Sequence, residues 1–313
     1  MRIYNSIEEL VGHTPLLKLN KLMHRFRLKA NVLAKCEFYN PLFSIKDRVA
    51  LNMLNKAPFS KINENTVFIE ATSGNTGIAL AAFCAYRGYK LIIVMPENMS
   101  AEKIALIRHF GAEVMLTPAA EGMEGSIHKV EILKSRSANL IEFKQFENPA
   151  NVEAHMLTTG AEIMQDTDGN VDAVVCGVGT SGTLTGVVST LKSCNPDLYV
   201  VAVEPEESNV LSSGVKGAHR IGGIGAGFIP PFYNVELIDE IYQVSSVRAL
   251  EATQTVAETE GLPVGVSAAA ALVAAMDLAL RDEFTGKNIV VILPDSIERY
   301  LSDPFFNMQN EAE

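Results

Sequence analysis

Short apolar runs alternate along the chain with longer stretches whose apolar residues recur at helical spacing. The apolar runs predict strands over 31–35, 67–71, 90–95, 113–116, 171–176, 199–204 and 288–293. The longer stretches predict helices near 46–57, 75–88, 100–110, 123–138, 151–166, 182–194, 247–260 and 267–283. Strands that alternate with helices typically form parallel sheets covered by helices on both faces. The pattern therefore predicts an α/β fold.

Two glycine-rich turns, each directly after a predicted strand, indicate two such sheets. Residues 72–77 read Thr-Ser-Gly-Asn-Thr-Gly, and residues 177–183 read Gly-Val-Gly-Thr-Ser-Gly-Thr. Ligands of open α/β sheets bind beyond the carboxyl ends of the strands. We therefore expect both turns to face a cleft between two units, with a boundary at the proline-containing loop near 146–149.

Composition limits the class of partner. The chain has 313 residues, 48% of them hydrophobic and 20% charged, and a net charge of −11. These values are typical of a globular protein, and the absence of a basic stripe argues against a nucleic-acid partner. No signal-peptide core precedes residue 10, and the alanine-rich stretch 268–275 is shorter than the roughly 20 apolar residues of a membrane span. We expect a cytoplasmic protein with no membrane partner.

Cysteine and histidine usage predicts no metal site. The four cysteines, at 36, 84, 176 and 194, lack paired metal-ligand spacing, and we expect them to be buried, reduced thiols. The six histidines are best interpreted as ordinary surface or core residues.

Lys46 is the candidate catalytic residue, within residues 40–48, Asn-Pro-Leu-Phe-Ser-Ile-Lys-Asp-Arg. Taken alone, a lysine beside Asp47 and Arg48 would be a solvated surface charge. The two turns change this interpretation, because unpaired N–H groups at a helix start bind carboxylate or phosphate. A lysine in a cleft can form a Schiff base or transfer a proton. Two anion sites and one lysine together indicate an amino acid reacting on pyridoxal phosphate.

Each motif also has a simpler interpretation. The turn at 72–77 and Ser267 would both serve as helix N-caps, although the first has more hydroxyl and amide groups than a cap uses. Residues 177–182 fit Gly-x-Gly-x-x-Gly, with Glu204 where a ribose-binding acid would stand, so an NAD-dependent oxidoreductase is an alternative. The hydroxyls of residues 180, 181 and 183 suit a phosphate monoester better. Neither a Walker loop nor a serine-hydrolase elbow is present.

These motifs together resemble the cysteine synthase (O-acetylserine sulfhydrylase) family of fold type II pyridoxal-phosphate enzymes, which also include cystathionine β-synthases. The segments that carry the resemblance are 12–16, 40–48, 70–77, 145–149, 158–160, 177–183, 223–230 and 298–302. The resemblance implies two parallel-sheet α/β domains, like the tryptophan synthase β subunit, with the active site in the cleft between them. The smaller domain would span 36–148, possibly with 1–12, and the larger would span 13–35 and 149–313.

The resemblance also implies a role for each site residue. Lys46 would hold the cofactor and act as the catalytic base, Asn75 would contact the ring hydroxyl, and Ser267 would bind the ring nitrogen. The cofactor phosphate would be bound by Gly179, Thr180, Ser181, Gly182 and Thr183. The substrate carboxylate would be bound by Thr72, Ser73, Thr76 and Gln145, with Gly227 at the rim of the substrate site.

The implied reaction forms L-cysteine and acetate from O-acetyl-L-serine and sulfide through an aminoacrylate. Ala226 and Gly227 favour this sulfhydrylase form, because cystathionine β-synthases tend to have Tyr-Asp there. Ser181, Ala269 and Ile297 stand where many relatives carry glycine. Ser181 is expected to preserve phosphate binding, whereas Ala269 and Ile297 line or adjoin the cofactor pocket and leave the substrate preference open. The alternatives are cysteine as substrate, with release of hydrogen sulfide and formation of lanthionine or serine, or homocysteine as nucleophile. The resemblance further implies a homodimer that can hold the C-terminal tail of serine acetyltransferase.

Overall fold

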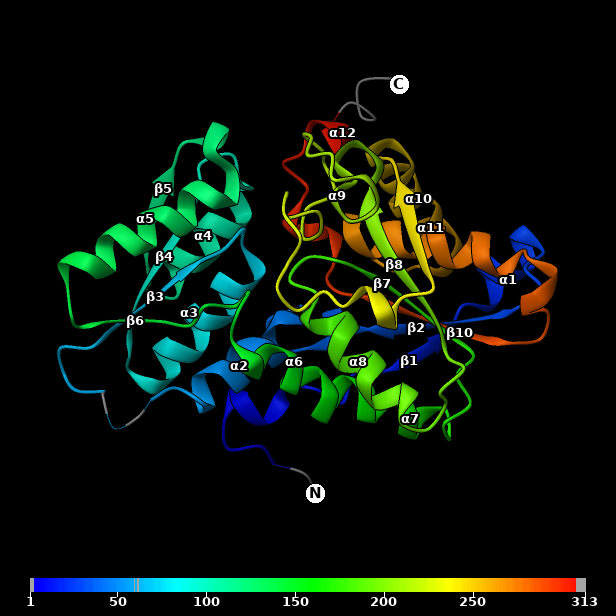
Figure 1. Cartoon of the computed structure of the whole chain (residues 1–313), viewed down its shortest axis with the longest axis horizontal. Coiled ribbons are helices and arrows are strands. Elements are labelled where there is room, and N and C mark those ends of the chain that lie inside the picture. The colour runs from blue at the N-terminus through cyan, green and yellow to red at the C-terminus, as the bar shows by residue number, and fades with distance from the viewer. Residues whose placement is uncertain (1–2, 59, 61, 308–313) are drawn as a thin grey trace.

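The computed structural model describes residues 3–58, 60 and 62–307, which form two α/β lobes (Figure 1). The predicted domain ranges extend into residues 1–2, 59, 61 and 308–313, which lie outside the described residues. The small lobe, on the left in Figure 1, is built on a four-stranded sheet and the large lobe on a six-stranded sheet. The two-lobed α/β architecture predicted from the sequence is confirmed.

The large sheet has the strand order β1-β2-β10-β7-β8-β9. Its strands are β1 (Leu16–Lys18), β2 (Asn31–Cys36), β7 (Ala173–Gly177), β8 (Tyr199–Pro205), β9 (Glu240–Val244) and β10 (Asn288–Leu293). All neighbouring strands are parallel except β1, which pairs antiparallel to β2 with Leu17 opposite Ala34. The large sheet is therefore mixed, with one antiparallel edge strand, and is not purely parallel as the sequence pattern suggested.

Helices cover both faces of the large sheet because its central strands are apolar on both sides. Val201 and Val203 pack with helices α1 (Asn20–Phe26), α10 (Ser246–Glu260) and α11 (Val266–Ala279). Val200 and Ala202 point to the other face and pack with α8 (Gly182–Lys192) and α7 (Ala161–Asp166). Successive side chains of β8 thus point to opposite faces of the sheet and pack in two separate cores.

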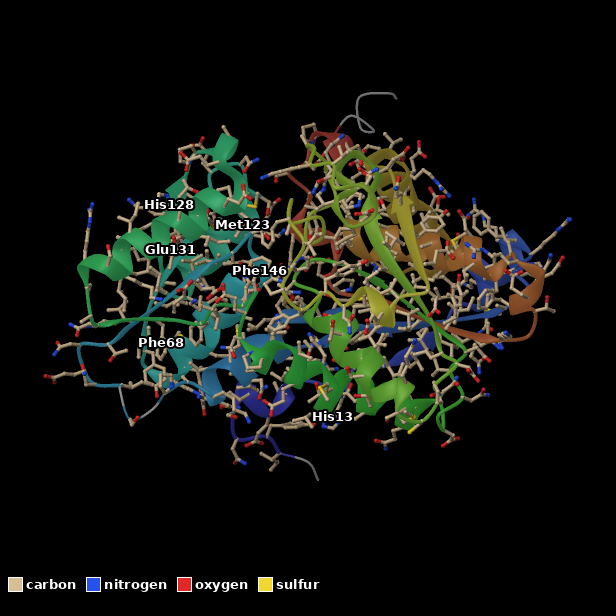
Figure 2. The ribbon with its side chains drawn as sticks, in the orientation of Figure 1. His13, Phe68, Met123, His128, Glu131 and Phe146 are labelled. Atoms are coloured by element: carbon tan, nitrogen blue, oxygen red, sulfur yellow. The ribbon has the colours of Figure 1, made fainter. Side chains whose placement is uncertain are left out.

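The small sheet is wholly parallel, with the order β5-β4-β3-β6. Its strands are β3 (Val67–Ala71), β4 (Lys90–Pro96), β5 (Glu113–Thr117) and β6 (Leu140–Glu142). Phe68 packs on one face with α2 (Lys46–Asn55), α3 (Asn75–Arg87) and α4 (Ala101–His109), and Ile69 packs on the other with α5 (Gly122–Arg136). Figure 2 shows Phe68 inside this lobe and His128 and Glu131 on the outer side of α5.

The remaining helices lie between the lobes, after β8 or near the end of the described chain. They are α6 (Pro149–Ala154), α9 (Val210–Ser213) and α12 (Pro304–Asn307), with a π-helix at His155–Gly160 between α6 and α7. Strands of the small sheet lie within residues 67–142, whereas those of the large sheet come from 16–36 and 173–293. The chain therefore begins in the large sheet, forms the small one and then returns.

Most predicted elements are present, and the differences have local causes. The sequence pattern missed β1 and β6, which have only three residues each, and the edge strand β9. The single helix predicted at 151–166 is divided by the π-helix. Cys36, Cys84 and Cys176 are buried as expected, but Cys194 is exposed because it follows the last turn of α8. Among the described residues, no helix has the length and apolar character needed to cross a membrane.

Candidate active site

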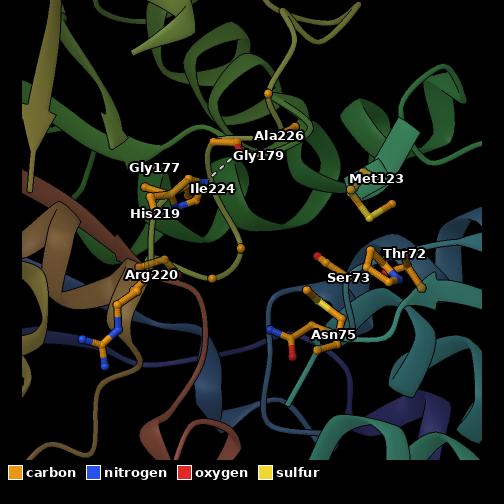
Figure 3. Close-up of a pocket in the computed structure, with 18 of the residues that line it drawn as sticks. Thr72, Ser73, Asn75, Met123, Gly177, Gly179, His219, Arg220, Ile224 and Ala226 are labelled. Carbon is orange, nitrogen blue, oxygen red and sulfur yellow. Dashed lines mark hydrogen bonds between the residues drawn. The ribbon is translucent and has the colours of Figure 1, made fainter. Parts of the chain in front are cut away.

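A cavity of about 910 Å3 lies between the lobes. Figure 3 shows Thr72, Ser73 and Asn75 on its small-lobe side, across from Gly177 and Gly179 of the large lobe. All predicted site residues line the cavity except Gly182, which lies in the same loop: Lys46, Thr72, Ser73, Asn75, Thr76, Gln145, Gly179, Thr180, Ser181, Thr183, Gly227 and Ser267. Both glycine-rich turns follow the carboxyl ends of parallel strands, which explains why they meet there.

Lys46 is the first residue of α2, and its side chain lines the cavity. The preceding turn is fixed by Asp47, whose Oδ2 accepts the N–H of Leu42 at 2.7 Å. Within the described part of the chain, the Lys46 amine has no hydrogen bond or ion pair. Burial lowers its pKa, an effect that the charges of Asp295 and Glu37 only partly oppose. A lowered pKa favours the neutral amine, the form that attacks carbonyl groups and accepts protons.

The loop at 179–183 leads from β7 into α8, and two of its glycines are required by close contacts. A Cβ on Gly179 would lie 2.5 Å from the carbonyl oxygen of Gly223, and a Cβ on Gly182 would overlap the side-chain amide of Asn151. Ser181 adopts the left-handed conformation, with φ of 64°. The first turn of α8 leaves N–H groups without intrahelical acceptors at the positive end of the helix dipole. The loop is thus a ready site for an anion.

Thr180 is oriented by Asn151, a residue of α6. Asn151 Nδ2 donates to Thr180 Oγ1 at 3.0 Å and to the carbonyl oxygen of Gln145 at 2.8 Å. The N–H of Gly182 also donates to Thr180 Oγ1, at 3.2 Å. Because this oxygen already accepts two hydrogen bonds, the hydroxyl proton of Thr180 is left to donate to an anion in the loop.

Thr183 contacts the buried His155 of the π-helix. The distance from Thr183 Oγ1 to His155 Nε2 is 3.1 Å, and His155 Nδ1 lies 2.9 Å from Thr159 Oγ1. Burial lowers the pKa of His155 well below its usual value, with the charges of Lys46 and Arg48 acting in the same direction. The imidazole is therefore neutral, with one nitrogen donating and the other accepting. With the proton on Nε2, the ring leaves the Thr183 hydroxyl proton free for an anion.

The turn after β3 forms a second polar site. Thr76 Oγ1 donates to Gln145 Oε1 at 2.8 Å, and Gln145 Nε2 donates to the carbonyl oxygen of Ala71 at 2.8 Å. Glu70 accepts the backbone N–H of Gln145 at 3.0 Å, which fixes the segment that carries this glutamine. Ser73 and the N-terminus of α3 complete a group of donors suited to a carboxylate.

Asn75 is held at both ends of its side-chain amide. Its Nδ2 donates to Asp295 Oδ2 at 2.7 Å, and its Oδ1 accepts from Arg299 Nη1 at 2.6 Å. Tyr300 also donates to Asp295 Oδ2, at 2.5 Å. The amide orientation is thereby determined, and the second N–H of Asn75 remains available for a ligand.

Ser267 and Gly227 lie on the large-lobe side of the cavity. Ser267 is 3% exposed, and in the described residues its hydroxyl has no hydrogen-bond partner, so it can donate to or accept from a ligand. Gly227 has φ of 83°, and a Cβ there would lie 2.9 Å from Lys216 Cε. The backbone at the rim is therefore in a conformation that glycine adopts most readily.

Sequence reasoning missed the supporting residues Asn151, His155, Asp295 and Arg299. Asn151 and His155 come from the helices after the Pro149 loop, and Asp295 and Arg299 come from the segment after β10. Arg299 lies in the motif 298–302 that carried the family resemblance, although that motif gave it no role. No local pattern distinguished His155 from an ordinary core histidine.

The structure does not support Glu204 as the ribose-binding acid of an NAD-dependent oxidoreductase. Glu204 is 1% exposed, and its carboxylate accepts the N–H groups of Leu211 at 2.8 Å and Ser212 at 3.1 Å. It caps the short helix α9 and is not available to a ribose. Among the described residues, no cluster of three or more His, Cys, Asp or Glu could hold a metal.

The donors that face the cavity fit pyridoxal phosphate. The loop at 179–183 would hold the phosphate, the free N–H of Asn75 the ring hydroxyl, and the unpartnered Ser267 hydroxyl the ring nitrogen. The unpaired amine of Lys46 would meet the aldehyde. Among residues 3–58, 60 and 62–307, none of these groups has a protein partner for the interaction that the cofactor would supply. The cavity therefore offers donors that the described protein does not itself use.

Comparisons with known proteins identify the family of the chain. Residues 7–295 match the family described as pyridoxal-phosphate dependent enzymes. A cysteine synthase of Staphylococcus aureus is 44% identical over 308 residues, covering 98% of each chain. The crystal structure of a cysteine synthase from Entamoeba histolytica has a TM-score of 0.92 and 42% identity, covering 98% of this chain and 91% of that one. An O-acetylserine dependent cystathionine β-synthase from Helicobacter pylori has a TM-score of 0.91 and 37% identity, covering 97% and 99%.

Proposed function

The chain belongs to the family of pyridoxal-phosphate dependent enzymes, and from this premise we propose that it is a cysteine synthase that forms L-cysteine and acetate from O-acetyl-L-serine and sulfide. The observation that carries the proposal is the meeting of three features in one cavity. These are the unpaired amine of Lys46, the anion-binding loop at 179–183, and the carboxylate-binding turn at 72–76. The names of the relatives in Staphylococcus and Entamoeba support the choice of reaction.

Binding of the substrate is assigned to the small-lobe turn. Thr72, Ser73, Thr76 and Gln145 would hold the carboxylate of the amino acid, which places its Cα near Lys46. Asn75 and Ser267 would fix the cofactor ring from opposite lobes, and the loop at 179–183 would fix its phosphate. Bound pyridoxal phosphate supplies an aldehyde that condenses with amines and a ring that withdraws electrons from Cα.

Lys46 would be the general base and the general acid. When its amine is not bonded to the cofactor, Lys46 would take the proton from Cα of the substrate. Acetate then leaves Cβ with the bonding electrons, and the sulfur of HS⁻ forms the new bond at Cβ. Lys46 returns the proton to Cα. The lowered pKa of Lys46 suits this role, because the amine must be neutral to accept the first proton.

The same residues would support related reactions, in which cysteine is the substrate and hydrogen sulfide is released, or homocysteine is the nucleophile. The name of the Helicobacter relative joins O-acetylserine with cystathionine synthesis. Ala226 and Gly227 at the rim favour O-acetylserine, because neither side chain can protonate the hydroxide that serine would lose.

We also propose an oligomeric state, a partner protein, a domain division and a cellular location. Exposed apolar side chains, Tyr39 at 63%, Phe43 at 57% and Leu157 at 66%, are consistent with a homodimer. The cationic side chains of Lys216 and Arg220 line the cavity and would attract the carboxyl terminus of serine acetyltransferase. We place the domains at 36–148, possibly with 1–12, and at 13–35 with 149–313, in a cytoplasmic enzyme.

The test is a substrate matrix on the purified holoenzyme. O-acetylserine, serine and cysteine are each assayed with sulfide and with homocysteine. The proposal expects the highest kcat/KM for O-acetylserine with sulfide. A higher value for cysteine without added sulfide would instead assign the enzyme to hydrogen sulfide release.

A further inference from the structure

Glu70 is a buried carboxylate on β3, and the reaction above does not use it. It is 2% exposed, and in the small sheet it lies opposite the apolar Ile93 of β4. Its two oxygens accept successive backbone N–H groups, from Lys144 at 2.8 Å and from Gln145 at 3.0 Å. Successive N–H groups that converge in this way form the nests in which backbone binds anions. Within the described residues Glu70 has no ion pair, so the turn after β6 is what holds its charge.

The turn that Glu70 binds presents Gln145 to the substrate site. Lys144 is in the left-handed conformation, with φ of 58°, which is uncommon for residues other than glycine. The side chain of Gln145 is 4% exposed and lines the cavity. Its Oε1 accepts from Thr76 and its Nε2 donates to the carbonyl oxygen of Ala71, each at 2.8 Å. One N–H of the amide is left for the substrate carboxylate, and the turn determines where it lies.

The backbone of Gln145 is also held by Asn151, whose Nδ2 donates to its carbonyl oxygen at 2.8 Å. Of these two anchors, only Glu70 can gain or lose a proton. Both oxygens of Glu70 are good acceptors when the carboxylate is ionised. On protonation one of them becomes a hydroxyl, a weaker acceptor, whereas among the described residues Glu70 only accepts hydrogen bonds. Protonation therefore weakens one of the two contacts that hold the turn.

Glu70 can change its charge at slightly alkaline pH. Burial raises its pKa to about 8, and the charge of Glu142 on β6 acts in the same direction, against the backbone N–H groups that Glu70 accepts. Glu142 itself pairs with Lys134 of α5 at 2.7 Å. In the turn, Lys144 pairs with Glu147 at 2.8 Å. Both lysines are engaged with other carboxylates, which leaves the charge of Glu70 to the two N–H groups.

We propose that Glu70 is a positioning residue for the substrate carboxylate, which fixes the turn at Gln145 when it is ionised and releases it when it gains a proton. This inference rests on the proposed function, because it assumes that the cavity binds an amino acid through its carboxylate. A second effect has the opposite sign, since ionised Glu70 would also repel the substrate carboxylate. The contact with the turn and the repulsion thus predict opposite dependences of affinity on pH. The proposal requires the contact to dominate.

Glu70→Gln tests this role, because glutamine has the shape and the neutrality of the protonated carboxyl group. L-Alanine is the probe, since it has the carboxylate and the amino group of the substrate but no leaving group. Its Kd for each holoenzyme is measured by absorption titration of the cofactor between about pH 6.5 and pH 9.5. The Kd of the variant divided by that of wild type should be near one at the lower pH and rise to about tenfold at the higher pH. The rise should centre on about pH 8.

The ratio of two Kd values cancels the titration of the alanine amine and of groups that both proteins share. Glu204→Gln is the matched control, because Glu204 is also buried and accepts two backbone N–H groups, but does not line the cavity. Its ratio to wild type should not change with pH. A ratio for Glu70→Gln that is the same at every pH would mean a purely structural role, and one that falls as pH rises would mean that repulsion dominates. Either result would overturn the proposal.

Glu142→Gln gives a second test that keeps Glu70 and does not depend on the folding of Glu70→Gln. Removing the charge of Glu142 should lower the pKa of Glu70, so the variant should bind L-alanine more tightly than wild type between about pH 7 and pH 8 and equally well at pH 9.5. Equal affinities throughout would reject the role of Glu70. Absent turnover of O-acetylserine with sulfide, alongside the expected alanine ratios, would reject only the proposed reaction.

Discussion

Asp295 Oδ2 and Asn75 Nδ2 lie 2.7 Å apart, in a contact that joins the segment after β10 to the first residue of α3. The residues are 220 positions apart in the sequence and belong to different lobes. Because Arg299 holds the other end of the same amide, Asn75 can present only its remaining N–H to the cavity. The large lobe thus determines how a small-lobe residue faces the cofactor site.

Asp295→Asn should weaken cofactor binding through this contact. The substitution removes the charge that accepts from Asn75 and Tyr300, so the amide of Asn75 loses its fixed orientation. We expect the Kd for pyridoxal phosphate to rise about tenfold, together with a shift in the visible absorption of the bound cofactor. Asp303→Asn is the control, because Asp303 lines the cavity but pairs with Arg220. Equal effects of the two variants would show that Asp295 acts only through net charge.

Lys46→Ala should abolish turnover and the covalent attachment of the cofactor. No other described lysine of the cavity is expected to replace it, because Lys103 and Lys216 lie on other elements. The test is borohydride reduction followed by mass spectrometry, with Lys103→Met as the control that keeps the linkage. The variant should fold, since a lysine whose amine has no protein partner contributes little to stability. A reducible lysine–cofactor bond in Lys46→Ala would contradict the assignment.

Thr180→Ala combined with Thr183→Ala should lower the affinity for pyridoxal phosphate. Each hydroxyl is oriented by a neighbour, Asn151 or His155, and each hydrogen bond to a charged phosphate is worth about 1.5–3 kcal/mol. Equilibrium dialysis gives the change in Kd. Thr190→Ala, farther along α8, is the matched control. Unchanged affinity for the cofactor, or tight binding of NAD by wild type, would instead favour an NAD-dependent oxidoreductase.

Glu162→Gln should remove stability that depends on pH. Glu162 Oε1 and Oε2 accept from Arg48 Nη1 and Nη2 at 2.6 and 2.7 Å, and Lys35 lies 2.9 Å away. Burial alone would raise the pKa of Glu162, but the hydrogen bonds and charges of Arg48 and Lys35 outweigh it and lower the pKa to about 2. Because the pKa is lower in the folded state, ionised Glu162 stabilises the fold at pH values above its unfolded pKa. This contribution to stability is lost as pH falls towards 2.

The difference in stability between wild type and Glu162→Gln should therefore be largest near neutral pH, at about 3–5 kcal/mol, as expected for a broken buried ion pair. It should shrink between about pH 4.5 and pH 2. Thermal unfolding across this range measures it, with Glu153→Gln as the control at an exposed ion pair. A difference that stays constant down to pH 2 would mean that folding does not lower the pKa of Glu162.

The sequence predicted best what local chemistry determines. The central strands β7, β8 and β10 are apolar on both faces, and the glycine-rich turns carry hydroxyls next to helix starts, so both could be recognised without a structure. The residues that orient the site could not be recognised from the sequence. Asp295 and Arg299 reach Asn75 only because the chain returns to the large sheet after building the small one, and His155 reaches Thr183 only because α6 and the π-helix pack on α8. Such contacts follow from tertiary structure and leave no periodic signal.

Gly227→Asp should shift the enzyme from O-acetylserine towards serine. A carboxyl group at this rim position could donate a proton to the hydroxide that leaves serine, whereas acetate needs no such help. The position has φ of 83°, which disfavours most side chains but is better tolerated by Asp and Asn, and the new side chain would contact Lys216. Gly227→Asn is therefore the matched control, with the same shape and backbone strain but no proton to give. The measurement is the ratio of kcat/KM for serine to that for O-acetylserine. We expect the ratio to rise in Gly227→Asp and to stay at the wild-type value in Gly227→Asn. If it rises equally in both, the cause is the geometry of the rim, and if it rises in neither, Gly227 does not determine the leaving group.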